Sequence, residues 1–152
     1  MRILLDTNIL LRTAEPSHSQ FRLTSDAVDR LEGQEHLLVV VPQVFYEFWT
    51  VATRPTENNG LGQNLAEAGR HLITFRELYR LLRDERAIFP IWEQLVTRYA
   101  VKGKPAHDAR LVAAMIRHSI THLLTYNTSD FKRYPEITAL SPVSILDGVE
   151  LV

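Results

Sequence analysis

The distribution of short apolar segments is the feature that most constrains how this sequence folds. Five mostly apolar runs occur along the chain, at residues 2–5, 37–41, 87–89, 122–125 and 143–146. Each is apolar on consecutive positions, which is typical of strands that are buried on both faces of a sheet. Helical patterns lie between them, at residues 24–31, 42–53, 65–82, 90–99 and 105–118. We therefore predict an α/β fold in three layers, with a mostly parallel central sheet flanked by helices.

Prolines mark the expected start of three of these helices, because Pro42, Pro90 and Pro105 each stand where the first helical residue would be. The chain has 152 residues, the usual size of one compact domain, and contains no repeat, low-complexity tract or long linker. Residues 54–62 are rich in turn formers and indicate an internal loop. We therefore expect residues 1–152 to form a single domain.

The composition excludes several classes of site. The sequence has no cysteine, which excludes disulfides, thiolate nucleophiles and cysteine-based zinc sites. Its net charge is −1, so binding to nucleic acid would depend on a local basic patch. The longest apolar run, residues 111–116, is far shorter than the roughly 20 residues that span a bilayer. Asp6 and Asn8 interrupt the apolar N-terminus too early for a secretory leader, so we expect a cytoplasmic protein without membrane contact.

Four acidic residues interrupt the apolar pattern. Asp6 directly follows the first predicted strand, and Asp130 lies just beyond the fourth. Glu47 and Asp108 stand at helical spacing from apolar residues, which places both carboxylates on stripes that face the core. Each acid also has a structural alternative. Asp6 and Asp130 belong to residue types that cap helices or form turns, an arginine would neutralise Glu47 in the core, and a helix N-terminus would favour Asp108.

Taken together, the four acids point to one place in the fold. In a parallel α/β fold, the strand ends and the first turns of helices meet at one edge of the sheet, where ligands bind. Carboxylates gathered there repel one another unless a cation or protons relieve them. Oxygen ligands without thiolates or paired histidines suit Mg²⁺ or Mn²⁺. Such a site predicts hydrolysis of a phosphodiester bond by metal-activated water.

Other catalytic classes lack their motifs. The chain has no GxxxxGK[ST] or GxGxxG phosphate-binding loop and no GxSxG serine motif. A phosphotransferase with an aspartyl nucleophile would need a second acid two residues after Asp6, where the chain has Asn8. His107 adjoins Asp108, and we expect it to pack against neighbouring residues rather than to contact a substrate.

Four short segments together resemble the PIN-domain family of metal-dependent ribonucleases, and more closely the VapC-type toxins of bacterial toxin–antitoxin pairs. They are Leu-Asp-Thr-Asn-Ile-Leu at residues 5–10, Tyr-Glu-Phe at 46–48, His-Asp-Ala-Arg at 107–110 and Thr-Tyr-Asn-Thr-Ser-Asp-Phe at 125–131. Each segment is short, so the resemblance depends on all four occurring in this order. Their order and spacing extend from residue 3 to residue 146.

The resemblance implies an acidic quartet that carries catalysis, made of Asp6, Glu47, Asp108 and Asp130. Within it, Asp6, Asp108 and Asp130 would hold Mg²⁺ or Mn²⁺. Four flanking residues would keep the carboxylates in position, as metal sites require: Thr7, Asn8, Thr125 and Asn127. The first two would act at the end of the first strand, with Asn8 hydrogen-bonded to an acid, and the last two near Asp130.

The function implied is that of an endoribonuclease toxin acting on single-stranded parts of a tRNA or another structured RNA. Basic residues on both sides of Asp108 would position the RNA phosphates: Lys102, Lys104 and Arg110. The resemblance also implies a homodimer and a cognate antitoxin that restrains the toxin. Phe75, Leu78 and Tyr79 exceed what one buried stripe needs, and belong either to the core or to a partner surface.

Two other hypotheses remain open. The main alternative is a catalytically silent module of the same fold that binds RNA or a protein. A metal-dependent phosphatase is a third hypothesis, which the missing second acid and the missing phosphate loop disfavour.

Overall fold

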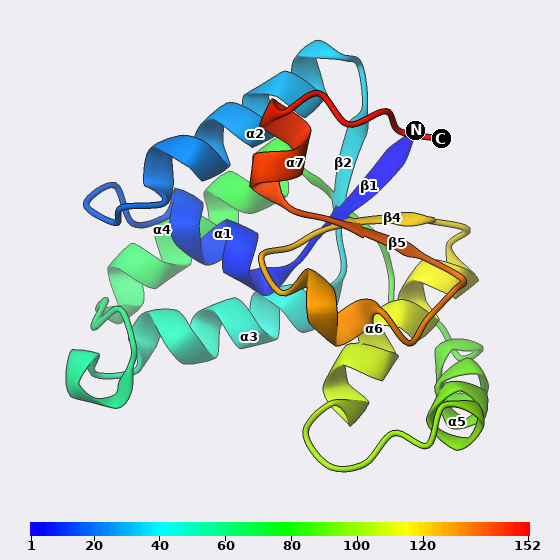
Figure 1. Ribbon diagram of the computed structural model, residues 1–152. Helices are drawn as coiled ribbons and strands as arrows, with labels where there is room; N and C mark the ends of the chain where they lie inside the picture. Colours follow the sequence, from blue (N-terminus) through cyan, green and yellow to red (C-terminus); the bar gives the residue numbers. More distant parts are fainter.

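The computed structural model describes residues 1–152 and contains a five-stranded sheet in the order β3-β2-β1-β4-β5 (Figure 1). The strands are β1 (Arg2–Leu5), β2 (Leu37–Val40), β3 (Arg80–Leu81), β4 (His122–Leu124) and β5 (Thr138–Leu140). Every neighbouring pair of strands is parallel. The register aligns Leu4 with Val39 of β2 and with Leu123 of β4, so β1 is the central strand. The predicted parallel sheet is confirmed.

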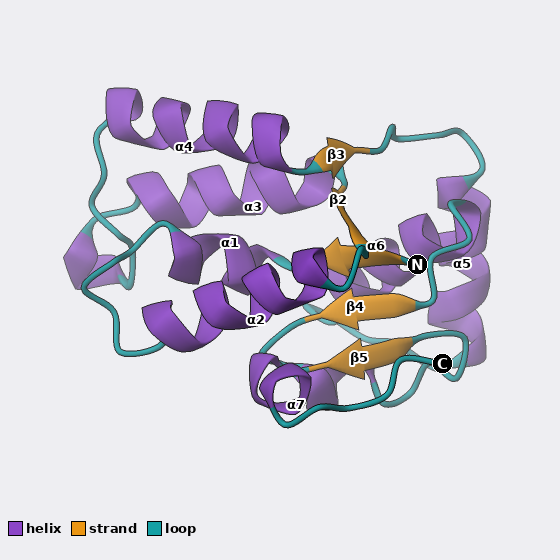
Figure 2. Cartoon of the chain, turned by 90° about the horizontal axis from the view of Figure 1, so that it is seen from above, coloured by secondary structure: helices purple, strands orange, loops and turns teal.

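Helices cover both faces of the sheet. They are α1 (Thr7–Thr13), α2 (Phe21–Gly33), α3 (Pro42–Thr53), α4 (Leu65–Leu78), α5 (Ile88–Arg98), α6 (Ala106–Arg117) and α7 (Pro142–Leu146), with 3-10 helices η1 (Thr56–Asn58) and η2 (Thr128–Phe131) in the connections. α5 and α6 pack against each other, apart from the other helices (Figures 1 and 2). The chain runs from β1 to β3 in one direction along the sheet and returns to β4 in the other. Because crossovers between parallel strands are right-handed, this reversal places α5 and α6 on the opposite face and gives the predicted three layers.

Two of the five predicted strands are wrong. Residues 87–89 lead into and begin α5, and residues 143–146 belong to α7. The third and fifth strands are instead β3, at the end of the predicted helix 65–82, and β5. Both are edge strands of two or three residues, and both residues of β3 are exposed. Such strands are held by backbone pairing rather than by a buried apolar run, so the apolar pattern does not reveal them.

The three predicted helix starts that proline marks hold to within two positions. Pro42 is the first residue of α3, Pro105 is the residue immediately before α6, and Pro90 is the third residue of α5. A proline is tolerated in a first turn because backbone N–H groups there have no partner within the helix. The short helix α1 directly after β1 was not among the predicted helices, because its seven residues are too few to show a helical repeat.

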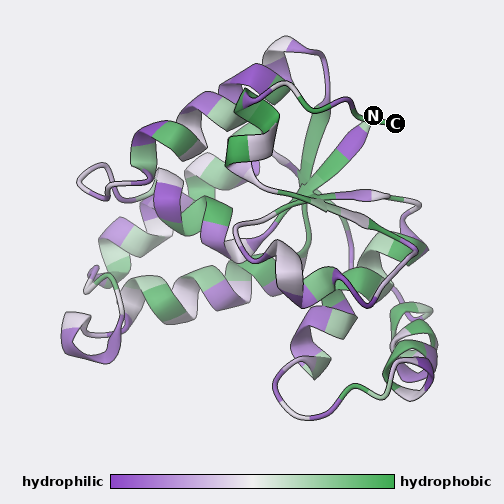
Figure 3. Ribbon diagram, viewed as in Figure 1, coloured by the Kyte–Doolittle hydropathy of each residue, from purple (hydrophilic) through white to green (hydrophobic).

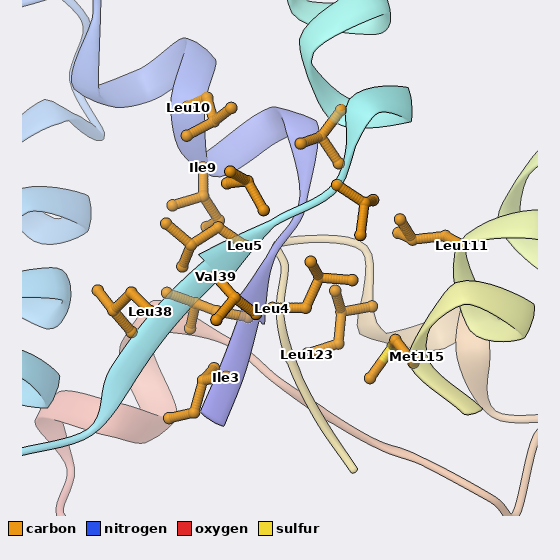
Figure 4. Close-up of a cluster of buried hydrophobic side chains, with 14 of the residues drawn as sticks. Ile3, Leu4, Leu5, Ile9, Leu10, Leu38, Val39, Leu111, Met115 and Leu123 are labelled. Atoms are coloured by element: carbon orange, nitrogen blue, oxygen red, sulfur yellow. The ribbon is translucent and has the colours of Figure 1, made fainter. Parts of the chain in front are cut away.

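The hydrophobic core surrounds the central strands. Figure 4 shows the apolar side chains that meet there: Ile3, Leu4, Leu5, Ile9, Leu10, Leu38, Val39, Leu111, Met115 and Leu123. Those from α1 approach β1 from one side and those from α6 from the other. Figure 3, coloured by hydropathy, shows mostly hydrophobic central strands and a hydrophilic loop between α3 and α4. None of the helices combines the length and the hydrophobicity that crossing a membrane requires.

Leu4→Ala tests the position of β1. Leu4 has no exposed surface, so we expect its truncation to lower the free energy of unfolding by about 2–5 kcal/mol. Leu65 of α4 is 68% exposed, and Leu65→Ala is the matched control, with an expected change below about 0.5 kcal/mol. Urea unfolding followed by circular dichroism measures both changes. Equal effects would contradict the central, buried position of β1.

Candidate active site

The carboxyl end of β1 lies where the strand order changes direction. From β1 the chain builds β2 and β3 on one side of the sheet, and later β4 and β5 on the other. In open parallel sheets such a switch point forms the crevice in which ligands bind. Asp6 directly follows β1, and Thr125 directly follows β4. Helix α6 leads back into β4, so its first turn, with Asp108, lies at this same edge.

Asp6 is held at the end of β1 by hydrogen bonds to both oxygens. Oδ1 accepts from the backbone N of Thr7 at 2.7 Å, so Asp6 also caps α1. Oδ2 accepts from Thr125 Oγ1 at 2.7 Å and from Asn8 Nδ2 at 3.3 Å. Only 9% of Asp6 is exposed. The carboxylate of Asp6 therefore both caps α1 and belongs to the candidate site.

Asn8 and Thr125 join the ends of β1 and β4. Asn8 Nδ2 donates to Thr125 Oγ1 at 3.1 Å, and Asn8 Oδ1 accepts from the backbone N of Tyr126 at 3.1 Å. The backbone N of Asn127 also donates to Thr125 Oγ1, at 3.1 Å. Thr125 therefore supports Asp6 and not the acid on its own segment. Asn127 contributes through its backbone, because its carbonyl also accepts from the backbone N of Asp130 at 3.0 Å.

Glu47 lies in the second turn of α3 and is half-buried. Its Oε2 accepts from Thr7 Oγ1 at 2.7 Å, and its Oε1 accepts from Gln43 Nε2 at 3.0 Å. The same nitrogen of Gln43 donates to the backbone carbonyl of His107 at 2.9 Å, which ties α3 to the start of α6. No arginine pairs with Glu47, so that structural alternative is wrong. Sequence reasoning missed Gln43, although its four-residue spacing from Glu47 places both on one helix face.

A cavity of about 510 Å³ opens where these elements meet. Its lining residues are Glu47, Lys104, Pro105, His107, Asp108, Asn127, Asp130 and Arg133. The structure thus brings three of the four predicted acids to one cavity. Asp6 does not line it, but lies near enough to raise the pKa of Asp108.

Only one of the three basic residues predicted to bind RNA lines the acidic cavity. Lys104 lines the acidic cavity, whereas Arg110 lines a neighbouring cavity and Lys102 lines neither. Arg133, which follows Asp130 closely in the sequence, contributes a second positive charge to the acidic cavity. His107 is exposed and lines the cavity, so the expectation that it packs is wrong.

Burial and neighbouring negative charges raise the pKa of Asp6 and of Asp108. Burial raises the pKa of Asp6, and the negative charges of Glu47 and Asp130 act in the same direction, whereas its hydrogen bonds oppose them. Burial also raises the pKa of Asp108 to about 6, and the other three acids add to that increase. No lysine or arginine forms a salt bridge with any of the four. The site therefore holds more negative charge than its own residues neutralise, a condition that a cation relieves.

The donor set fits a hard divalent cation in its chemistry. It offers carboxylate oxygens that form no salt bridge with lysine or arginine, and it contains no thiolate. No three His, Asp or Glu side chains approach closely enough to enclose a metal ion. Mg²⁺ commonly keeps several waters and is held through one or two carboxylates. The residues therefore fit an ion that retains much of its hydration.

A family model identifies the family to which the chain belongs. The sequence matches the model of the PIN domain over residues 3–137. The chain belongs to the PIN domain family. The matched region contains all four acids, and the five-stranded parallel sheet flanked by helices is the fold of this PIN domain. A search of curated proteins finds no match to the sequence.

Solved structures share this fold. One is VapBC2 from Rickettsia felis bound to a DNA fragment from its promoter, at 15% identity and a TM-score of 0.71, covering 93% of this chain and 98% of that chain. Another is VapBC-1 from nontypeable Haemophilus influenzae, at 17% identity and a TM-score of 0.70, covering 94% and 99%. A third is VapC20 from Mycobacterium tuberculosis, described as a sarcin–ricin loop cleaving toxin, at 18% identity and a TM-score of 0.57, covering 80% and 86%. At these identities the similarity is one of fold.

The raised pKa of Asp108 predicts how the metal-free protein responds to pH. Its pKa rises from 3.8 to about 6 on folding, so between these values the native state binds a proton that the unfolded chain has lost. Stability from this group is therefore present at low pH and is lost as the pH rises towards about 6. We expect Asp108→Asn to remove this dependence, and to maintain or raise the melting temperature at pH 7.

Thermal denaturation in EDTA across this pH range measures the effect. Asp26→Asn is the matched control, because Asp26 is an exposed residue of α2 and its replacement should leave the pH dependence of the wild type in place. A marked loss of stability in Asp108→Asn at pH 7 would instead assign Asp108 a structural role.

Proposed function

We propose that the protein is a metal-dependent endoribonuclease that acts as the toxin of a toxin–antitoxin pair, in a single domain of residues 1–152. The observation that carries this proposal is the cavity at the carboxyl end of β1, where carboxylates gather without forming a salt bridge to lysine or arginine. Membership of the PIN domain family supports it. The fold shared with VapC20, a toxin described as cleaving the sarcin–ricin loop, supports it further.

We assign metal binding to Asp6, Asp108 and Asp130, and we include Glu47 as the fourth catalytic acid. Bound Mg²⁺ or Mn²⁺ would supply a water nucleophile at neutral pH and would offset charge on the phosphate. The protein's own contribution is to hold the carboxylates in place. Thr125 and Asn8 orient Asp6, while Thr7 orients Glu47. Such supporting contacts are what metal sites need to keep their ligands aligned.

The substrate we propose is a single-stranded part of an RNA, such as a loop of a tRNA. Lys104 and Arg133 lie in the wall of the acidic cavity and would contact phosphate oxygens on either side of the scissile bond. Lys102 is exposed in the loop before α6 and would add a more distant contact. The cations lie beside the acids, so the phosphate would be held against the carboxylates and not elsewhere on this nearly neutral protein.

Cleavage assays on purified tRNA with Mn²⁺ or Mg²⁺ test this function. We expect Asp6→Asn and Asp108→Asn each to lower the cleavage rate by at least about 100-fold. The metal should also raise the melting temperature, because it binds only the native state, and the Asp6→Asn/Asp108→Asn double variant should lose that increase. Asp26→Asn should behave as the wild type in both measurements.

Two outcomes would change the assignment. A full increase in melting temperature in the double variant would overturn the metal ligands. RNA binding without any cleavage by the wild type would support the catalytically silent module.

We also propose two protein partners, a second copy of the chain and a cognate antitoxin in the same cytoplasm. Exposed apolar residues on α3 and α4 support a protein-binding surface, because Tyr46 is 63% and Leu78 is 58% exposed. Phe75 and Tyr79, at 3% and 5% exposed, belong to the core instead. An apolar cavity of about 510 Å³ opens beside this surface, lined by Pro42, Phe45, Tyr46, Trp49, Leu72, Arg76 and Leu81.

Co-expression with the product of the adjacent small open reading frame tests the antitoxin. We expect the neighbour to co-purify with this chain and to restore growth that the chain alone inhibits. Light scattering on the purified chain measures whether it is a dimer. A neighbour that neither binds nor changes toxicity would exclude this antitoxin without affecting the ribonuclease assignment.

A further inference from the structure

A second cavity lies beside the acidic one. Its volume is about 410 Å³, within the roughly 300–1,000 Å³ of small-molecule sites, and its lining residues are Asp84, Glu85, Ile88, Phe89, Trp92 and Arg110. Asp108 and Arg110 are two positions apart on α6 and so point to different sides of that helix. The acidic cavity and this second cavity therefore flank the first turns of α6 from two sides.

Phe89 and Trp92 of α5 form an aromatic wall of the second cavity. Their rings are stacked, with centroids 5.9 Å apart and planes inclined by 24°. Phe89 is 61% exposed, so its ring faces solvent instead of the core. Trp92 Nε1 donates to the backbone carbonyl of Ala106 at 2.8 Å, which fixes the indole against the first residue of α6. The result is an oriented aromatic platform open to solvent.

Charged groups at the edge of this platform are paired with one another. Arg110 Nη2 lies 3.5 Å from Asp84 Oδ2, and Glu85 forms an ion pair with Arg117. Because these charges balance, the second cavity has little attraction for a phosphate. Asp84 retains its second carboxylate oxygen, which takes part in no salt bridge or hydrogen bond within the protein. The cavity therefore combines a stacking surface with a hydrogen-bond acceptor at its edge.

Arg110 connects the second cavity to the acidic cavity. Its Nη1 donates to Gln43 Oε1 at 3.4 Å, and Gln43 Nε2 donates to Glu47 at 3.0 Å. A chain of two side chains thus links the platform region to a catalytic acid. An RNA strand whose phosphate lies in the acidic cavity would cross the first turns of α6 and reach the platform with a neighbouring base.

We propose that the second cavity binds an unpaired nucleobase of the RNA substrate and favours guanine. The proposal rests on the proposed ribonuclease function and names the substrate feature that the same site recognises. Proteins that read single-stranded RNA stack splayed-out bases on aromatic rings and hydrogen-bond their edges. Guanine presents two adjacent donors, N1–H and the N2 amino group, and the free carboxylate oxygen of Asp84 can accept from both. Uracil presents one donor between two acceptors, and adenine and cytosine each present one amino donor beside an acceptor, so none of them offers Asp84 two adjacent donors.

Binding of short fluorescent oligoribonucleotides in EDTA tests the proposal, because it requires neither metal nor cleavage. The probes are a hexamer of uridine and the same hexamer with one guanosine, with affinities measured by fluorescence anisotropy on the full chain. We expect the guanosine hexamer to bind at least about 5-fold more tightly to the wild type. Phe89→Ala should weaken its binding by roughly 5- to 100-fold, the range of one lost base stack.

Further variants separate stacking from edge recognition. Phe89→Tyr keeps an aromatic ring and should retain the affinity for both hexamers. Asp84→Asn keeps the platform but changes the edge group, and should bring the two affinities within about 2-fold of each other. Leu65→Ala removes a similarly exposed apolar side chain on α4 and should leave both affinities unchanged. Because Phe89 and Asp84 are exposed, thermal melts of their variants should match that of the wild type.

Each result bears on the proposal separately from the ribonuclease function. Guanosine preference that depends on Phe89 and Asp84, in a protein that cleaves no RNA, would support the second cavity and refute the enzyme. Cleavage of RNA by a protein whose Phe89→Ala and Asp84→Asn variants bind both hexamers as the wild type does would overturn the second cavity alone. Weakened antitoxin binding in Phe89→Ala with unchanged RNA binding would also overturn it, and would assign the platform to the protein partner.

Discussion

The buried carboxylate of Asp6 is the group on which the arrangement of the site depends. A carboxylate that loses its water is stable only where hydrogen bonds replace that water, and Asp6 receives them from Thr7, Asn8 and Thr125. These donors come from the segment after β1 and the segment after β4. The hydrogen bonds to this one buried charge therefore hold together the ends of β1 and β4, the two strands between which the strand order changes direction.

At the same edge of the sheet, repulsion between carboxylates lowers the stability of the metal-free protein. Burial and the negative charges of neighbouring acids raise the pKa of Asp6 and of Asp108, and no lysine or arginine forms a salt bridge with any of the four acids. A residue set selected only for stability would place a lysine or arginine there, as the chain does for Asp84 and Glu85 on the neighbouring surface. Sites that keep such a conflict are typical of function, because a ligand resolves it.

Gln43 shows how a neutral side chain can organise several charged ones. It is 7% exposed and contacts Glu47, the carbonyl of His107 and Arg110. Through it α3 is joined to the start of α6, so the helix that carries Asp108 is oriented by the helix that carries Glu47. The two faces of the sheet thus meet at the site through one amide, which also reaches the arginine beside the aromatic platform.

The sequence by itself determined the elements whose burial is complete. β1, β2 and β4 were predicted to within one residue, because strands covered on both faces must be apolar at every position. The four acids were found by the same reasoning, since a charge in or next to an apolar stripe stands out. β3 and β5 were not found, because edge strands depend on backbone pairing, and the apolar residues 143–146 that resembled a strand form α7 after Pro142.

Only the tertiary structure decided which groups touch. Thr125 bonds to Asp6 across 119 positions of sequence, although its own segment carries Asp130. Gln43 reaches His107 across 64 positions, and Trp92 contacts the first residue of α6. Periodicity and local composition record how deeply a residue is buried and on which face of its element it lies. They do not record which distant element covers that face, because this depends on the direction in which each crossover leaves the sheet.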